Sequence, residues 1–132
     1  MNTEELKKRT KQFGLRCIKV AESLPNTRTG DVLSKQLVRS ATSVGANYRS
    51  ACRAQSKPTF ISKIAIAIEE ADEAQFWLAM IVEAGLMPQK KLADLMKESD
   101  EIVAILTASS KTAKANLRKS INNQKSTIRN QS

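Results

Sequence analysis

Apolar residues recur at intervals of three and four residues along the first part of the chain, which is the period of an amphipathic helix. The repeating positions between about Thr3 and Leu24 are Leu6, Thr10, Phe13, Cys17, Val20 and Leu24. Thr3, followed by Glu4 and Glu5, is expected to cap this helix, because a hydroxyl and acidic side chains stabilise a helix N-terminus. Pro25 ends the helix in a turn of sequence Pro-Asn-Thr-Arg-Thr-Gly.

The next stretch, from Asp31 to Gln55, has three distinct sides when it is drawn as a helix at about 100° per residue. The core side holds Leu33, Leu37, Ala41, Val44, Tyr48 and Ala51. The opposite side is a cationic stripe of Lys35, Arg39, Arg49 and Arg53, and a flank of small residues comprises Ser40, Ser43, Asn47, Ser50 and Ala54. We expect Asp31 or Thr29 near the start of this helix. Gly45 within it predicts close packing against another helix, since glycine otherwise destabilises a helix interior.

A third helix is expected from about Thr59 to Ala84, with Ser56 as its cap and Pro58 in its first turn. Its heptad positions are Ile61, Ile64, Ile68, Ala71, Gln75, Leu78 and Val82. A second apolar surface carries Ile66, Ala74, Trp77, Met80 and Ile81. A single packing interface within the chain would not bury both the heptad positions and this second surface. We therefore expect an oligomer interface on the second one, with a position at the centre of its own bundle as the alternative.

Gly85 is expected to end the third helix and Pro88 to open the fourth. The fourth helix keeps the heptad through Leu92, Leu95, Ser99, Ile102, Leu106, Ser109 and Ala113, and beyond Leu117 the chain becomes polar and basic. We expect residues 1–120 to form a single domain and residues 121–132 a flexible basic tail. The predicted fold is all-α, an antiparallel up-down-up-down four-helix bundle.

Composition supports this fold and adds an uneven distribution of charge. Only four glycines and three prolines occur among 132 residues, and the net charge is +9. Residues 1–57 carry 12 Lys/Arg against 4 Asp/Glu, residues 58–101 carry 4 against 9, and residues 102–132 carry 6 against none. The chain is therefore basic at both ends of its sequence and acidic in the middle, and basic surfaces favour polyanionic partners.

The sequence predicts a cytoplasmic protein that is not bound to a membrane. The charged start MNTEELKKRTK does not resemble a signal peptide. No apolar run approaches the roughly 18–20 residues that are needed to span a bilayer. Cys17 and Cys52 lie on core faces without a metal or redox spacing, so we expect reduced thiols, with a bridge between them as the alternative.

Motifs of catalysis are missing, and we expect a protein that is not an enzyme and uses no metal or cofactor. The sequence has no histidine, no phosphate-cradling glycine loop and no zinc-ligand spacing. The acidic cluster of Glu69, Glu70, Asp72 and Glu73 lacks the Glu-x-x-His motif of a di-metal bundle. We expect these carboxylates to form salt bridges with basic neighbours.

The basic surface is the remaining candidate site. We expect phosphate contacts at Lys35, Arg39, Arg49 and Arg53, with a second patch at Lys111, Lys114 and Arg118. Because no aromatic residues are interleaved with these cations, backbone-directed binding of structured RNA is favoured over base stacking on single strands. A merely solvated charged face remains the alternative.

One long stretch of the chain resembles a known family. The stretch QLVRSATSVGANYRSACRAQSKPTFISKIAIAIEEADEAQFWLAMIVEAGL is similar to the four-helix-bundle proteins encoded in intervening sequences of bacterial 23S ribosomal RNA genes. The segments around Arg39-Ser40-Ala41 and Glu70-Ala71 carry the likeness. Ser50 departs from the pattern, which usually has a glutamate there, so a role that relatives assign to that acid is not carried over.

The resemblance implies a left-handed bundle that assembles as a homopentamer, with Ser43, Asn47, Ile66, Trp77 and Met80 at the subunit contacts. It also implies association with RNA, and related bundle proteins act as accessory factors of retroelement reverse transcriptases. The leading hypothesis is an oligomeric protein that binds structured RNA. The alternative is an adaptor that docks an RNA-processing enzyme or a polymerase without touching nucleic acid. The third possibility is a scaffold protein without a ligand.

Overall fold

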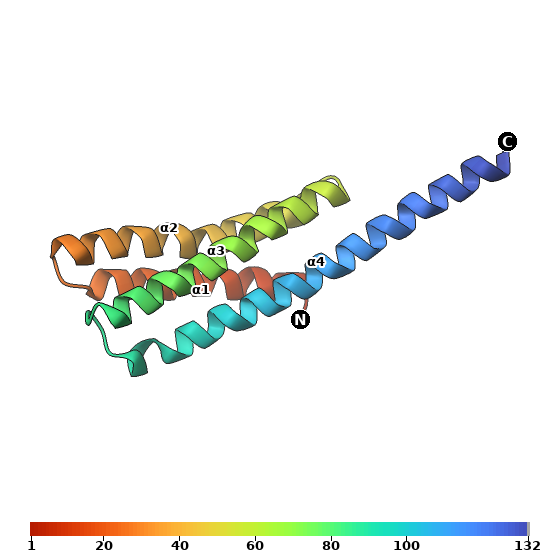
Figure 1. Cartoon of the computed structure of the whole chain (residues 1–132). Coiled ribbons are helices and arrows are strands. Elements are labelled where there is room, and N and C mark those ends of the chain that lie inside the picture. The colour runs from red at the N-terminus through yellow and green to blue at the C-terminus, as the bar shows by residue number, and fades with distance from the viewer. Residues whose placement is uncertain (132) are drawn as a thin grey trace.

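Four helices account for nearly all of the chain in a computed structural model, which describes residues 1–131 (Figure 1). They are α1 (Thr3–Ser23), α2 (Arg28–Cys52), α3 (Lys57–Glu83) and α4 (Gln89–Gln131). Short turns reverse the direction of the chain three times, and α1 packs on α2, α2 on α3 and α3 on α4. The predicted up-down four-helix arrangement is therefore confirmed.

The helix starts show which polar residue satisfies the free amides of each first turn. The side chain of Asn2, not the predicted Thr3, caps α1 by accepting a hydrogen bond from the Glu5 amide at 2.8 Å. Thr27 caps α2 and accepts from the Gly30 amide, four residues before Asp31 and two before Thr29, the two residues expected near the start. Ser56 caps α3 as predicted. In the first two cases, an earlier residue in extended conformation was free to turn its oxygen toward the amides.

The end of α3 is set by Gly85, as the sequence predicted. Gly85 has a φ of 75°, a left-handed conformation that costs a glycine little. The amide of Leu86 donates to the Ile81 carbonyl at 3.1 Å, and the Gly85 amide donates to the Val82 carbonyl at 2.9 Å. These two bonds satisfy carbonyls that the last turn would otherwise leave free.

The core confirms the predicted inner faces of α1 and α2. Leu33, Leu37, Ala41, Val44, Tyr48 and Ala51 are all buried, as are Leu6, Thr10, Phe13, Cys17 and Leu24. Val20 is half-buried against this cluster. On α4, the heptad residues Leu92, Leu95, Ser99, Ile102 and Leu106 are buried too. The 3-4 periodicity thus located the inner faces of α1 and α2, and that of α4 as far as Leu106. Beyond Leu106, Ser110 is buried and the predicted Ser109 and Ala113 are only half-buried.

The inner face of α3 is rotated relative to the predicted one. The fully buried residues are Ile64, Ala67, Ala71, Ala74, Leu78 and Ile81, each 0% exposed. For Ala74 and Ile81 the expected oligomer interface is wrong, and the alternative of a position at the centre of the bundle is confirmed. The reason is that α3 lies between α2 and α4 and packs against both, so it buries a wider face than a peripheral helix.

Small residues bring the backbones of α1 and α2 close together. A Cβ atom at Gly45 would lie 3.4 Å from the Lys11 amide nitrogen, and one at Gly14 would lie 3.4 Å from the Ala41 carbonyl oxygen. The close packing predicted from Gly45 is therefore confirmed, and it takes place within the chain.

An ion-pair cluster joins α1 to α4, which otherwise have little contact. The Arg9 guanidinium donates to both carboxylate oxygens of Glu98, at 2.8 and 2.7 Å, and to Glu101 at 2.5 Å. The hydrogen bonds and the positive charge of Arg9 lower the pKa of Glu98 despite its partial burial, which acts in the opposite direction. This cluster closes the side of the bundle where apolar packing is sparse.

The sequence tail continues α4 instead of forming a separate segment. Residues 121–131 are helical, and Figure 1 shows the end of α4 projecting beyond the other three helices. The division into a domain of residues 1–120 and a flexible tail stays a prediction, and residue 132 lies outside the described residues.

Two helical glycines are expected to respond oppositely to the same substitution. A Cβ at Gly30 would lie 2.2 Å from the Pro25 carbonyl oxygen, whereas at Gly45 the nearest atoms are at ordinary contact distance. We expect Gly30→Ala to destabilise the protein by about 1–3 kcal/mol. Gly45→Ala should be neutral or stabilising by up to about 1 kcal/mol, because alanine favours helix. Urea unfolding of both variants checks this, and equal effects would contradict it.

Arg9→Gln is expected to lower the free energy of unfolding by about 1–2 kcal/mol at pH 7, since it removes charged hydrogen bonds from the partly buried Glu98 carboxylate. The pKa of Glu98 in the folded protein lies below its ordinary value of 4.5. Its contribution to stability is therefore present above that value and lost as the pH falls through the folded pKa.

Unfolding midpoints at pH 7 and pH 3 test this pair. The drop in stability on acidification should be smaller for Arg9→Gln than for the wild type. Lys8→Gln, on an exposed residue of the same helix, is the matched control and should leave the drop unchanged. An identical drop in all three proteins would show that the Arg9–Glu98 pair contributes nothing to stability.

Candidate nucleic-acid interface

The predicted cationic stripe of α2 is divided in two by its surroundings. At its N-terminal end, the Lys35 ammonium pairs with Asp31 of the same helix at 3.1 Å, and Arg39 pairs with two carboxylates of α3. At its C-terminal end, Arg49 and Arg53 are exposed and form no ion pair within the described residues. Only the second half therefore presents charge that no carboxylate compensates.

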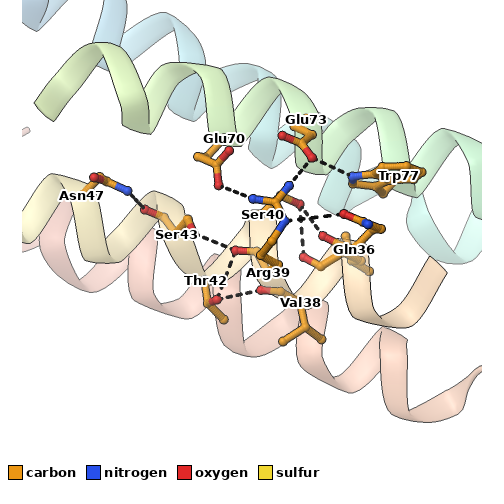
Figure 2. Close-up of polar contacts among 11 residues, drawn as sticks. Gln36, Val38, Arg39, Ser40, Thr42, Ser43, Asn47, Glu70, Glu73 and Trp77 are labelled. Carbon is orange, nitrogen blue, oxygen red and sulfur yellow. Dashed lines mark hydrogen bonds and ion pairs between the residues drawn. The ribbon is translucent and has the colours of Figure 1, made fainter. Parts of the chain in front are cut away.

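Arg39 lies in a polar network that ties α2 to α3 (Figure 2). Its guanidinium donates to Glu70 at 3.0 Å and to Glu73, and the Trp77 indole N–H donates to the same Glu73 oxygen at 3.2 Å. The hydrogen bonds from Trp77 and from Arg39 lower the pKa of Glu73. The pKa of Arg39 is raised by its bond to Glu73. Half of the Arg39 side chain remains exposed, so the pair lies at the surface.

This network bears on the acidic cluster of α3. The predicted salt bridges are confirmed for Glu70 and Glu73, which both contact Arg39. Glu69 and Asp72 form no ion pair among the residues described here, and they lie on the exposed side of the helix. The four acids therefore do not converge on one point, because two of them turn toward α2 and two toward solvent.

A surface groove between α1 and α2 brings Arg49 together with lysines of the first helix. The groove has a volume of about 530 Å³ and is lined by Lys7, Thr10, Lys11, Gly14, Leu15, Ile18, Thr42, Gly45, Ala46 and Arg49. Gly14 and Gly45 have no side chains, so backbone forms the floor of the groove. Three cations surround it, namely Lys7, Lys11 and Arg49. Lys7 is paired with Glu4 at 3.3 Å, whereas Lys11 and Arg49 have no carboxylate partner in the described part of the chain.

The sequence did not single out Lys7 and Lys11 as site residues. A signal existed, because the two lysines are four residues apart and so share one face of α1. What the sequence lacked was the rotation of α1 against α2, which depends on the close approach at the two glycines.

The second predicted patch lies on a different element. Lys111, Lys114 and Arg118 are exposed on the projecting part of α4, which makes no contact with α2. Figure 1 places that part of α4 at the end of the bundle where α2 also ends, the end that carries Arg53. The two patches thus lie on helices that make no contact with each other.

The predicted subunit contacts have mixed surroundings within the single chain. Ser43 and Asn47 bond back to carbonyls of their own helix, at 2.8 and 2.9 Å. Ile66 and Met80 are each 37% exposed, and Trp77 is half-buried. Phe76, which the sequence analysis passed over, is 55% exposed and stacks edge-on against Trp77 with ring centroids 5.0 Å apart.

Groups that could support chemistry are sparse in the described residues. Burial raises the pKa of the Cys17 thiol to about 12, so it is no nucleophile at neutral pH. Cys17 and Cys52 are both free, which excludes the alternative of a bridge between them. Residues 1–131 contain no group of three metal-ligating side chains. Within the same range, no helix has both the length and the apolar character that crossing a bilayer requires.

Comparisons with known proteins give a consistent family assignment. A family model described as 23S rRNA-intervening sequence protein matches residues 3–108. A crystal structure of a protein with unknown function from the S23 ribosomal protein family of Bacteroides thetaiotaomicron is 33% identical, with a TM-score of 0.78. The match covers 84% of this chain and 99% of that one. No curated protein matches the sequence. Because the family model spans most of the chain, the protein belongs to the 23S rRNA-intervening sequence protein family.

Proposed function

We propose that this protein binds structured RNA through backbone phosphates and has no enzymatic activity. The observation that carries the proposal is the set of exposed cations without carboxylate partners around the α1–α2 groove. Arg49 and Lys11 stand at the groove, and Arg53 follows one turn beyond Arg49 at the end of α2. Phosphates are the natural ligands of such uncompensated charge, and their binding releases counterions.

Family membership supports the same class of ligand. The family is named after intervening sequences of 23S rRNA, and the solved relative belongs to the S23 ribosomal protein family. The free thiols fit a reducing compartment, which agrees with the proposed cytoplasmic location.

Within the predicted α2 stripe, the proposal assigns different roles to the two halves. Arg49 and Arg53 serve as phosphate contacts. Lys35 and Arg39 are weaker candidates, because a phosphate would have to compete with Asp31, Glu70 and Glu73 for them. Arg39 acts mainly as a link between α2 and α3.

A salt series with an RNA hairpin tests this proposal. The variant Arg49→Gln/Arg53→Gln should lose affinity, and the slope of log affinity against log salt should fall by about 1.8, at about 0.9 per lost duplex phosphate contact. The matched control Lys35→Gln/Arg39→Gln removes the same charge and should reduce the slope less. If both pairs have equal effects, the division of the stripe is refuted. If the wild type binds no RNA, the adaptor reading replaces the proposal, with an acidic protein as partner.

We further propose that the protein is a homo-oligomer, with the pentamer that the family resemblance implies as the expected form. The exposed side of α3 supports this, because Ile66, Phe76 and Met80 leave apolar surface uncovered in the single chain. Ser43, Asn47 and Trp77 remain candidate contacts at its margin. Apolar faces of this kind commonly mark protein interfaces.

The double substitution Ile66→Asp/Met80→Asp is expected to dissociate the oligomer, since burying two carboxylates in an apolar interface is costly. Light scattering after gel filtration should then give the mass of a single chain, 14.6 kDa, instead of a multiple of it. Val32→Asp, at an exposed apolar residue of α2, is the control and should keep the larger mass. A wild-type protein of 14.6 kDa would refute the oligomer.

A further inference from the structure

The fourth helix is longer than the bundle it belongs to. It has 43 residues, against 21, 25 and 27 for the other three. Ser110 is its last buried residue among those described, and the family model ends at residue 108. The part from residue 111 to residue 131, here called the α4 arm, projects into solvent beyond the other helices (Figure 1). The arm is therefore an addition to the bundle that defines the family.

Most cations of the arm lie on one side of it. At about 100° per residue, Lys111, Lys114, Arg118 and Lys125 fall within a sector of about 60°. They extend over about 21 Å at a rise of about 1.5 Å per residue. The diametrically opposite side carries only uncharged polar residues, namely Asn116, Ser120, Asn123 and Thr127. Lys119 falls about 80° from Lys111 and so outside this sector. Lys111, Lys114, Arg118 and Lys125 form a straight row of positive charge in a single direction.

None of these four cations has a carboxylate partner in the described chain, and all four are exposed. Residues 102–132 contain no acid at all, so a partner within the arm is ruled out by composition. Arg129 already takes part in another interaction and is left out of the set. The row therefore differs from Lys35 and Arg39 on α2, whose charge is largely compensated.

The apolar part of the arm is too thin to account for its presence. Leu117 is half-buried, Ile121 and Ile128 are 41% and 66% exposed, and the polar Gln124 separates the two isoleucines. A helix that lies on a membrane or in a protein groove usually has a continuous apolar face, which Gln124 interrupts here. The arm has no aromatic residue, which also removes the platform for stacking single-stranded bases.

We infer that the α4 arm lies along the phosphates of a double-stranded stem in the bound RNA, with Lys111, Lys114, Arg118 and Lys125 as its contacts. This inference rests on the proposed function and adds the duplex as the ligand and Lys125 as a site residue. A duplex holds its phosphates in fixed rows, which match a row of cations on a rigid helix. The major groove of A-form RNA is too narrow for a helix, so the arm contacts the backbone beside the wide minor groove.

The same geometry predicts that the arm is stabilised by its ligand. Lys114 and Arg118 are four residues apart, and like charges at that spacing destabilise a helix by about 0.2–0.5 kcal/mol. Phosphates between them replace this repulsion by attraction. Hydrogen exchange of amides in the arm should therefore slow on binding duplex RNA, whereas amides of the α1–α2 core should change little.

The test uses the full chain with Lys111, Lys114, Arg118 and Lys125 changed to Gln. The matched control changes four exposed lysines elsewhere, Lys8, Lys19, Lys90 and Lys91, and so removes the same net charge. The probe is a blunt RNA duplex of about 20 base pairs, longer than the roughly 16 that one compact duplex-binding domain spans. One strand alone and a DNA duplex of the same sequence serve as comparisons. Equal melting temperatures of the three proteins confirm that the bundle is intact.

We expect the wild type to prefer the RNA duplex to the single strand, and the salt slope to fall by about 3–4 in the arm variant and by less than about 1 in the control. An unchanged slope in the arm variant overturns the inference. If Arg49→Gln/Arg53→Gln then still weakens binding, the proposed function survives without the arm. Equal affinity for the DNA duplex overturns the assignment to RNA. A wild type that binds none of the probes overturns both proposals.

Discussion

The structure depends on the burial of α3 between α2 and α4. Ala67, Ala71 and Ala74 let the neighbouring backbones approach this helix closely, and Ile64 and Leu78 fill the space between them. Because α1 packs mainly on α2, and α4 mainly on α3, each outer helix is held by one main neighbour. The side between α1 and α4 needs a different kind of support, which Arg9 supplies with its carboxylate partners.

The order of charge along the chain explains which cations are neutralised in the fold. The acidic middle of the sequence supplies carboxylates to α3 and to the first half of α4. Wherever one of these helices packs beside a basic one, an ion pair forms, as at Arg39 and Arg9. The α1–α2 groove and the α4 arm lie away from those acids. Both surfaces therefore keep cations that no carboxylate compensates.

The family model covers the first of these two surfaces and not the second. The groove is built from the part of the chain that the family model covers, and its shape follows from the packing of Gly14 against α2 and Gly45 against α1. The arm lies beyond residue 108, where the family model ends. The arm has no buried residue of its own among those described, but the buried half of α4 provides its helical nucleus. The bundle can therefore carry a rigid extension without enlarging its core.

The sequence by itself determined the four helices, most of their inner faces, and the start and end of α3. These features depend on local periodicity and on single residues such as Ser56 and Gly85, whose effect is confined to one turn. Only the tertiary structure decided how each helix is rotated against its neighbours. That rotation buried Ala74 and Ile81 within the chain and turned Arg39 toward two carboxylates. It depends on packing between residues far apart in sequence, which a helical period does not encode.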